Sequence, residues 1–131
     1  MEVIIGDSLT VETTVTEDKL AVNVGSGDLR VFATPMAVAL MENASAKLVA
    51  KYLDEGITTV GTGISIDHTS PTPVNATVFA KATVVESDGR TFKFQVEAWD
   101  KGGVISKGTH TRVSVKADKF QKKADSKFDE V

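Results

Sequence analysis

The chain has 131 residues, of which 41% are hydrophobic and 25% charged, and this is the length and composition of a single globular domain. A net charge of −3 argues against a general binder of nucleic acids or anionic membranes, because such proteins carry a basic face. The absence of cysteine excludes disulfides and thiol chemistry, and two histidines, His68 and His110, argue against an ordinary zinc site. The N-terminus has the pattern of neither a signal peptide nor a membrane anchor, so we expect a cytoplasmic protein.

The first predicted element is a strand from Ser8 to Thr16, where apolar and β-branched residues alternate with polar ones. A mixed segment with a glycine-containing loop at residues 25–28 follows. A long helix is then predicted from Pro35 to Glu55, with Thr34 as its N-cap, proline in the first position and Gly56 as the stop.

This helix is unusual because it is apolar on nearly every side. Between Val31 and Ala46 the only charged residue is Glu42, and no lysine or arginine lies one helical turn from it. A helix of this kind is normally surrounded by the rest of its domain. An unpaired acid there is costly unless something specific uses it, so Glu42 is the first functional candidate.

After residue 56 the hydrophobic period changes from helical to alternating, which predicts antiparallel strands joined by short turns. Ser87-Asp88-Gly89-Arg90 and Lys101-Gly102-Gly103 are turn signals between neighbouring strands. The predicted strands cover residues 58–69, 75–86, 91–100 and 104–115.

The predicted fold class is α+β, with an antiparallel sheet of about five strands curved around one central helix. The domain covers residues 1–116. Residues 117–131 form a charged C-terminal tail, for which a short amphipathic helix and a solvated end are both open. Exposed edge strands predict a homodimer, since edge pairing of two copies covers one edge of each. A monomeric ligand carrier with a cystatin-like helix and sheet is an alternative on fold alone.

Glu42 and His68 are the residues best suited to proton transfer. A carboxylate in an apolar helix can act as a general base or as a nucleophile, or it can reach solvent or a distant cation. His68 lies at a strand end before the proline-broken loop at residues 71–73, where catalytic side chains are often placed, although surface histidines occur there too.

Other polar positions have competing structural explanations. Thr34 is explained as a helix cap, but its hydroxyl could also bind substrate. Gly61 and Gly63 predict a bulge or a close backbone approach, where a free N–H could stabilise an oxyanion. His110 and Arg112 alternate on the last strand and could line either an exposed face or a pocket mouth.

Three segments resemble the single-hotdog acyl-CoA thioesterases of the fluoroacetyl-CoA thioesterase type. They are VFATPMAVALME, DEGITTVGTGISIDHTSPTP and SKGTHTRVSV, and the resemblance extends from about residue 8 to residue 115. It implies a hotdog fold, a dimer or a tetramer, and hydrolysis of an acyl-CoA thioester without metal or cofactor, with coenzyme A entering only as part of the substrate. Position by position, Thr34, Glu42 and His68 match the catalytic threonine, glutamate and histidine of that family.

The resemblance also implies that the Gly61 N–H faces the thioester carbonyl and that Arg112 lies near the acyl pocket. The segment VGSGDL before the helix lacks the aromatic lid of the fluoroacetyl-specialised enzyme, and only Phe32 remains, so the acyl group stays open. Two other activities fit the same fold, namely a non-catalytic acyl-CoA or lipid-binding module and a hydratase or dehydratase.

Overall fold

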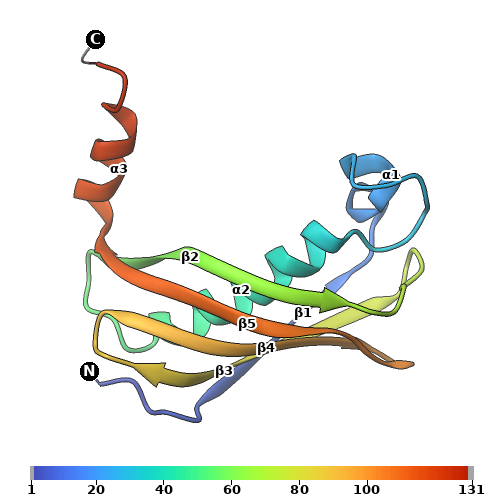
Figure 1. Ribbon diagram of the computed structural model, residues 1–131, viewed down its shortest axis with the longest axis horizontal. Coiled ribbons are helices and arrows are strands. Elements are labelled where there is room, and N and C mark those ends of the chain that lie inside the picture. Colours follow the sequence, from blue (N-terminus) through green and yellow to red (C-terminus); the bar gives the residue numbers. More distant parts are fainter. Residues whose placement is uncertain (1, 130–131) are drawn as a thin grey trace.

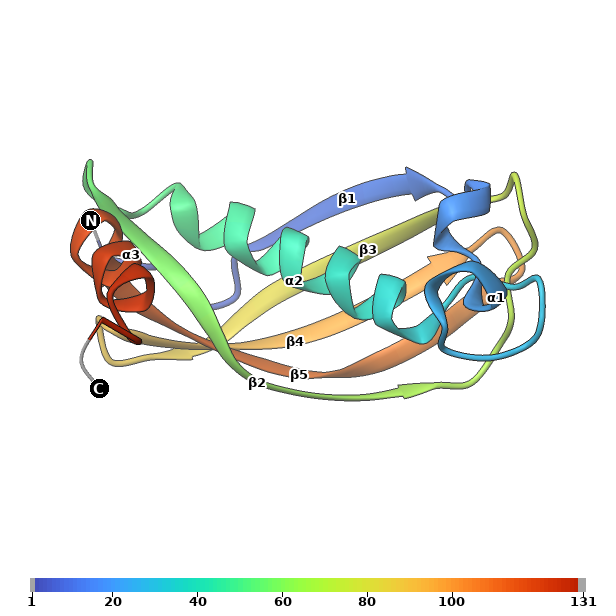
Figure 2. The ribbon, with the colours of Figure 1, turned by 90° about the horizontal axis from the view of Figure 1, so that it is seen from above.

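A computed structural model describes residues 2–129, so the first residue of the predicted domain and the last two of the predicted tail lie outside the described residues. Five strands form one antiparallel sheet in the order β1-β3-β4-β5-β2, and helix α2 lies across one face of it (Figures 1 and 2). The predicted α+β architecture is confirmed. The elements are β1 (Ser8–Thr14), a 3-10 turn η1 (Glu17–Lys19), α1 (Ala21–Val24), α2 (Thr34–Ala50), β2 (Ile57–His68), β3 (Thr77–Ser87), β4 (Thr91–Asp100), β5 (Gly103–Lys116) and α3 (Ala117–Asp125).

Both predicted ends of the long helix need correction. The helix begins at Thr34 itself with Ala33 as the N-cap, so the prediction that Thr34 caps the helix is wrong. It ends at Ala50 rather than at Glu55, because the chain turns where Lys51 and Tyr52 both donate hydrogen bonds to the carboxylate of Asp7. This turn leads directly into β2.

The core lies between α2 and the concave face of the sheet. The predicted inward-facing rows of β3 and β4 are all buried, and small side chains among them let the helix approach the sheet closely. The sheet does not surround the helix completely, since a stripe at residues 35, 39, 43, 47 and 50 is exposed. The rows are Val78, Ala80, Ala82 and Val84 on β3, and Phe92, Phe94, Val96 and Ala98 on β4.

The two ends of the molecule are built differently. Helix α1 lies beside the N-terminal end of α2, whereas α3 projects from the opposite end, where β2 begins (Figures 1 and 2). Helix α3 has no buried residue, so the tail begins with the short helix rather than with irregular chain. No helix in the described part of the chain is long and apolar enough to cross a membrane.

Strand β2 lies at one edge of the sheet, and a bulge changes its phase. Gly61 pairs with Arg112 and Gly63 with Thr111, so Thr62 is an extra residue without a partner on β5. The predicted bulge is therefore confirmed. Because of the extra residue, Gly61 and His68 both oppose helix-facing positions of β5, although they are seven residues apart.

Candidate active site

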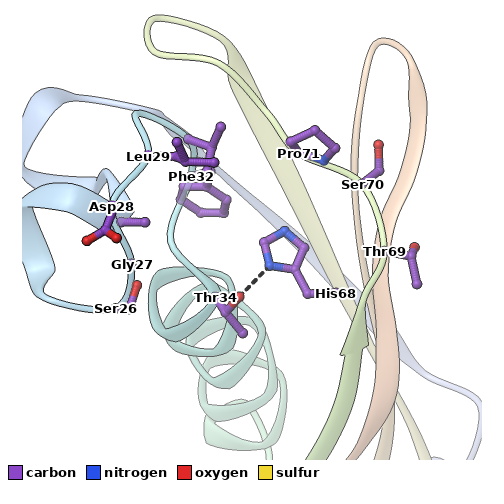
Figure 3. A pocket seen from close by; sticks show the side chains of 12 residues that line it. Ser26, Gly27, Asp28, Leu29, Phe32, Thr34, His68, Thr69, Ser70 and Pro71 are labelled. Atoms are coloured by element: carbon purple, nitrogen blue, oxygen red, sulfur yellow. Dashed lines mark hydrogen bonds between the residues drawn. The ribbon is translucent and has the colours of Figure 1, made fainter.

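Thr34 and His68 meet at the wall of a cavity of about 360 Å³ near the N-terminal end of α2 (Figure 3). Thr34 is the first residue of the helix and His68 the last residue of β2. Thr34 Oγ1 lies 2.7 Å from His68 Nδ1, which is hydrogen-bonding distance. The hydroxyl that was expected to cap the helix thus holds an imidazole instead.

Two chain segments face each other across this cavity. The segment before α2 supplies residues 26–29, and the loop after β2 supplies residues 69–71 (Figure 3). Phe32 lines the cavity and is 1% exposed, and its backbone N–H donates to the Thr72 carbonyl at 2.9 Å. This backbone bond ties the two segments together, so the predicted pocket residue Phe32 has a fixed position beside His68.

The second nitrogen of His68 is free for chemistry. Nε2 is buried, yet it has no hydrogen-bond partner within residues 2–129. A buried polar atom without a hydrogen-bond partner lowers the stability of the fold, and such atoms commonly bind a ligand or a water molecule. When Thr34 accepts a hydrogen bond from Nδ1–H, Nε2 carries the lone pair and can take a proton.

A second group of polar side chains lies further along α2 and β2. A Cβ placed on Gly61 would lie 3.1 Å from Glu42 Oε2, 3.1 Å from His110 Cε1 and 3.5 Å from Arg112 Nη1. A side chain at this position would crowd Glu42 and His110, so glycine suits this close approach. The predicted close approach at Gly61 is therefore present, together with the bulge beside it.

His110 and Arg112 are buried rather than part of an exposed strand face. They are 2% and 8% exposed and form one network with Thr59 and Gly63. Arg112 Nε donates to Thr59 Oγ1 at 2.8 Å and Nη2 donates to the Thr59 carbonyl at 3.0 Å. Thr59 was not among the predicted site residues, although it lies two positions before Gly61 on the same face.

The hydrogen bonds of His110 define a neutral ring. Arg112 Nη1 can only donate, so across 3.2 Å His110 Nε2 must accept, and the proton on Nδ1 is donated to the Gly63 carbonyl at 2.8 Å. Burial lowers the pKa of His110, and the positive charge of Arg112 lowers it further, against the opposing effects of the Gly63 carbonyl and Glu42. His110 has both nitrogens occupied and is a structural support rather than a proton carrier.

Glu42 faces this network without being locked into it. Its side chain is half-buried, and it makes no ion pair within 4.0 Å among the described residues. It is close enough to influence the pKa values of His110 and Arg112 through its charge. The carboxylate therefore keeps its oxygens available at the surface of the cluster.

Within one chain the two groups are separate. Thr34 and Glu42 are eight residues apart on one helix, or about 12 Å along its axis. Gly61 and His68 are seven residues apart on one strand, or roughly 20 Å. One chain therefore joins Thr34 with His68 and Phe32, and Glu42 with Gly61 and Arg112, but it does not bring Glu42 to His68.

No group of three or more histidine, aspartate or glutamate side chains in residues 2–129 is arranged to hold a metal ion. The chemistry that these two groups can support is proton transfer by His68, attack or base catalysis by Glu42, and hydrogen bonding to an anion beside Gly61.

Comparisons with known proteins agree on one family. A family model described as fluoroacetyl-CoA-specific thioesterase matches residues 15–118. The fluoroacetyl-CoA thioesterase of Streptantibioticus cattleyicolor is 38% identical over 97 residues, which cover 74% of this chain and 70% of that protein.

Solved structures extend the similarity to nearly the whole chain. A solved structure of a fluoroacetyl-CoA thioesterase superposes with a TM-score of 0.90 at 31% identity, and the match covers 97% of this chain and 98% of the other. A hot-dog-like protein from Thermanaerovibrio acidaminovorans superposes with a TM-score of 0.84 at 20% identity, over 95% and 92% of the two chains. The predicted hotdog fold is confirmed.

Proposed function

The chain belongs to the fluoroacetyl-CoA-specific thioesterase family and is an acyl-CoA thioesterase, and on this premise we propose that it hydrolyses a short-chain acyl-CoA with Thr34, Glu42 and His68. The observation that carries the assignment of residues is the His68 ring. One nitrogen is fixed by the Thr34 hydroxyl, and the other is buried and unpartnered at the wall of a cavity.

In the proposed reaction the thioester carbonyl lies beside the Gly61 N–H, which stabilises the negative charge that develops on the carbonyl oxygen. Glu42 either attacks the carbonyl carbon or removes a proton from the attacking water. The closeness of Glu42 Oε2 to Gly61 supports this arrangement, because the base and the oxyanion donor must flank the same atom.

His68 completes the reaction as a proton shuttle: Nε2 takes up the proton that the attacking water loses, directly or by way of Glu42, and a proton passes from His68 to the leaving thiolate of coenzyme A. If Glu42 is the nucleophile, that water cleaves the acyl-Glu42 anhydride and restores the carboxylate. Thr34 holds the ring so that Nε2 faces the reacting group, which is an orienting role toward His68 rather than toward Glu42. Arg112 supports the site by fixing Thr59 and His110, and Phe32 forms part of the wall around His68.

We propose that the working unit is a homodimer that pairs two β2 edges, with a tetramer formed from two such dimers. Strand β2 is twelve residues long, lies at the edge of the sheet and is exposed along most of its length. Antiparallel pairing about a two-fold axis near Ile64 and Ser65 would bring His68 beside the partner subunit's Gly61. The two separate groups of one chain then form two shared sites.

The proposed reaction needs no bound metal or cofactor, because proton transfer and an oxyanion donor suffice for transfer of an acyl group to water. Coenzyme A takes part only as the thiol of the substrate. A cytoplasmic location is part of the same proposal, since acyl-CoA thioesters are made and consumed inside cells.

The assignment is tested with a panel of short acyl-CoAs and detection of the released thiol. Glu42→Gln and His68→Ala should each lower kcat by roughly 100-fold or more, as expected for loss of a general acid or base. Glu12→Gln, an exposed carboxylate on β1, is the matched control and should keep wild-type turnover. Wild-type turnover in both site variants, with folding intact, would refute the assignment.

Mixed dimers test the shared site. When Glu42→Gln and His68→Ala subunits are refolded together in equal amounts, half of the dimers are mixed. If the sites are shared, each mixed dimer has one intact site and one site with both substitutions. About a quarter of wild-type activity should therefore return. If each site lies within one chain, mixing restores nothing.

A further inference from the structure

A cavity of about 490 Å³ at the opposite end of the molecule from His68 is lined by basic residues without an acid among them. Its walls come from the start of β2, the end of β5, the hairpin at residue 90 and one side of α3. The charged side chains are those of Arg90, Lys116, Lys119 and Lys123. Other cavities of this structure contain acids, such as Asp67 and Glu97 on the outer face of the sheet.

The four cations of this basic pocket are not neutralised by ion pairs, although the charge of Arg90 acts on nearby Asp88. None of them forms an ion pair within 4.0 Å in residues 2–129, whereas Arg30, Lys51, Lys81 and Lys93 elsewhere do. Four unpaired cations around one cavity repel each other, and this is unexpected in a chain with a net charge of −3. An anionic ligand would remove that repulsion.

The pocket also offers an aromatic surface. Phe120 lies on the same side of α3 as Lys119 and Lys123 and is 43% exposed. Cations beside an accessible aromatic ring suit a nucleotide, because the phosphates bind the cations and the base can stack on the ring. Backbone bonds hold the walls in place, since Ser114 N–H donates to the Arg90 carbonyl at 2.8 Å and Ala117 N–H to the Gly56 carbonyl at 2.9 Å.

The position of the pocket fits the length of coenzyme A. Ile57 lines the pocket and lies four residues before Gly61 on β2, which is about 13 Å along the strand. The pantetheine arm has thirteen bonds between the sulfur and the nearest phosphorus, or roughly 16 Å when extended. A thioester held at Gly61 can therefore place its phosphates at the basic pocket of the same chain.

We propose that Arg90, Lys116, Lys119 and Lys123, with Phe120, form the subsite for the phosphorylated adenosine end of coenzyme A. This inference rests on the proposed function, since it identifies the far end of the same substrate. It gives α3 a role in substrate binding, and the role is independent of the chemistry at Glu42 and His68.

The test compares two substrates that share an acyl group. The first is the acyl-CoA that the wild-type protein hydrolyses best, and the second is the same acyl group on pantetheine, which lacks the nucleotide. The double variant Lys119→Ala/Lys123→Ala should raise KM for the acyl-CoA about tenfold with kcat within twofold, as expected for two exposed charge pairs. For the acyl-pantetheine neither constant should change.

Lys122→Ala/Lys127→Ala is the matched control, because it removes the same charge from the C-terminal region without touching the pocket lining. It should leave KM unchanged. An equal rise of KM in both double variants would show a general charge effect and would overturn the subsite. An unchanged KM in Lys119→Ala/Lys123→Ala would overturn it as well.

Binding of free coenzyme A separates this inference from the proposed function. If the wild-type protein hydrolysed no thioester, the proposed function would fail, but calorimetry would still report on the pocket. Tenfold weaker binding of free coenzyme A by Lys119→Ala/Lys123→Ala than by wild type supports the subsite, and equal affinities overturn it.

Discussion

Replacement of Arg112 by methionine should destabilise the protein strongly, although the new side chain has a similar length and is apolar. The guanidinium is 8% exposed and makes three hydrogen bonds, two with Thr59 and one with His110. Removing it leaves three buried acceptors without their donors. Hydrogen bonds to charged groups contribute about 1.5–3 kcal/mol each, but losses within one network are not additive.

The expected loss in the free energy of unfolding is therefore about 3–4 kcal/mol, within the range for breaking a buried charged network. This is a large fraction of the roughly 5–15 kcal/mol that stabilises a typical domain. Arg112→Lys should lose less, about 2 kcal/mol, because the ammonium keeps the charge but cannot donate along the two directions of the guanidinium.

The assay is urea unfolding at one fixed protein concentration, since the proposed dimer would make apparent stability depend on concentration. Arg30→Met is the matched control: it also breaks an ion pair, at 2.6 Å to Glu17, but both side chains are more than half exposed, so the expected loss of stability is much smaller. Equal losses in Arg112→Met and Arg30→Met would refute the reasoning that burial makes this network costly to break.

Burial lowers the pKa of His110 from its ordinary value of 6.5. Below pH 6.5 the unfolded chain therefore takes up a proton that the folded chain does not, and the stability of the fold decreases as the pH falls from 6.5 toward the folded-state pKa. Between pH 7.5 and 5.5 urea unfolding should show up to about 1.4 kcal/mol more loss in wild type than in His110→Asn, and parallel curves would contradict this. Gly108→Ala should lower the free energy of unfolding by about 3 kcal/mol or more, because the new Cβ would lie 1.9 Å from a backbone oxygen of β2. Gly63→Ala is the control, since a Cβ there has nothing within 4 Å, and it should change stability by no more than about 0.5 kcal/mol in thermal unfolding. Similar losses in both variants would mean that the strand relaxes freely around the new side chain. Thr34→Val should lower kcat roughly tenfold or more by freeing the His68 ring, with unfolding changed by about 1 kcal/mol or less, and an unchanged kcat would remove Thr34 from the site.

The elements were predictable where one physical signal dominates. The alternating rows on β3 and β4 are all buried as expected, because each strand has one face on the core and one on solvent. The glycines at 61 and 63 correctly indicated a bulge and a close approach, since these are two of the reasons for which glycine interrupts a strand.

The errors lie where distant residues decide local structure. Propensity alone favours Thr34 as a cap and a helix that continues to Glu55. The hydroxyl is instead bound by His68 from a strand thirty-four residues away, and the helix stops where Asp7 binds Lys51 and Tyr52. Nothing near those positions in the sequence carries this information.

The site was predictable as a set of residues but not as an arrangement. Glu42 and His68 were recognisable by chemistry, yet their separation in one chain follows from the axial rise of α2 and the length of β2. The burial of His110 and Arg112 could not be predicted either, because it depends on the register that sets them opposite Phe94 and Phe92 of the buried row of β4, and that register includes an irregularity between Ala98 and Trp99.

At the extra residue Thr62 the alternation of β2 side chains between the two faces of the sheet is reversed. Before the bulge the odd-numbered positions, such as Thr59 and Gly61, oppose the helix-facing row of β5, and after it the even-numbered positions, such as Ile66 and His68, do so. If Thr62 were paired in a regular ladder instead of being bulged, residues seven apart would lie on opposite faces, and His68 would turn away from the helix. The separation of seven residues between Gly61 and His68 thus places both on the helix-facing side only because Thr62 is bulged, whereas deletion of Thr62 should leave His68 opposite Ser106 and on that same side.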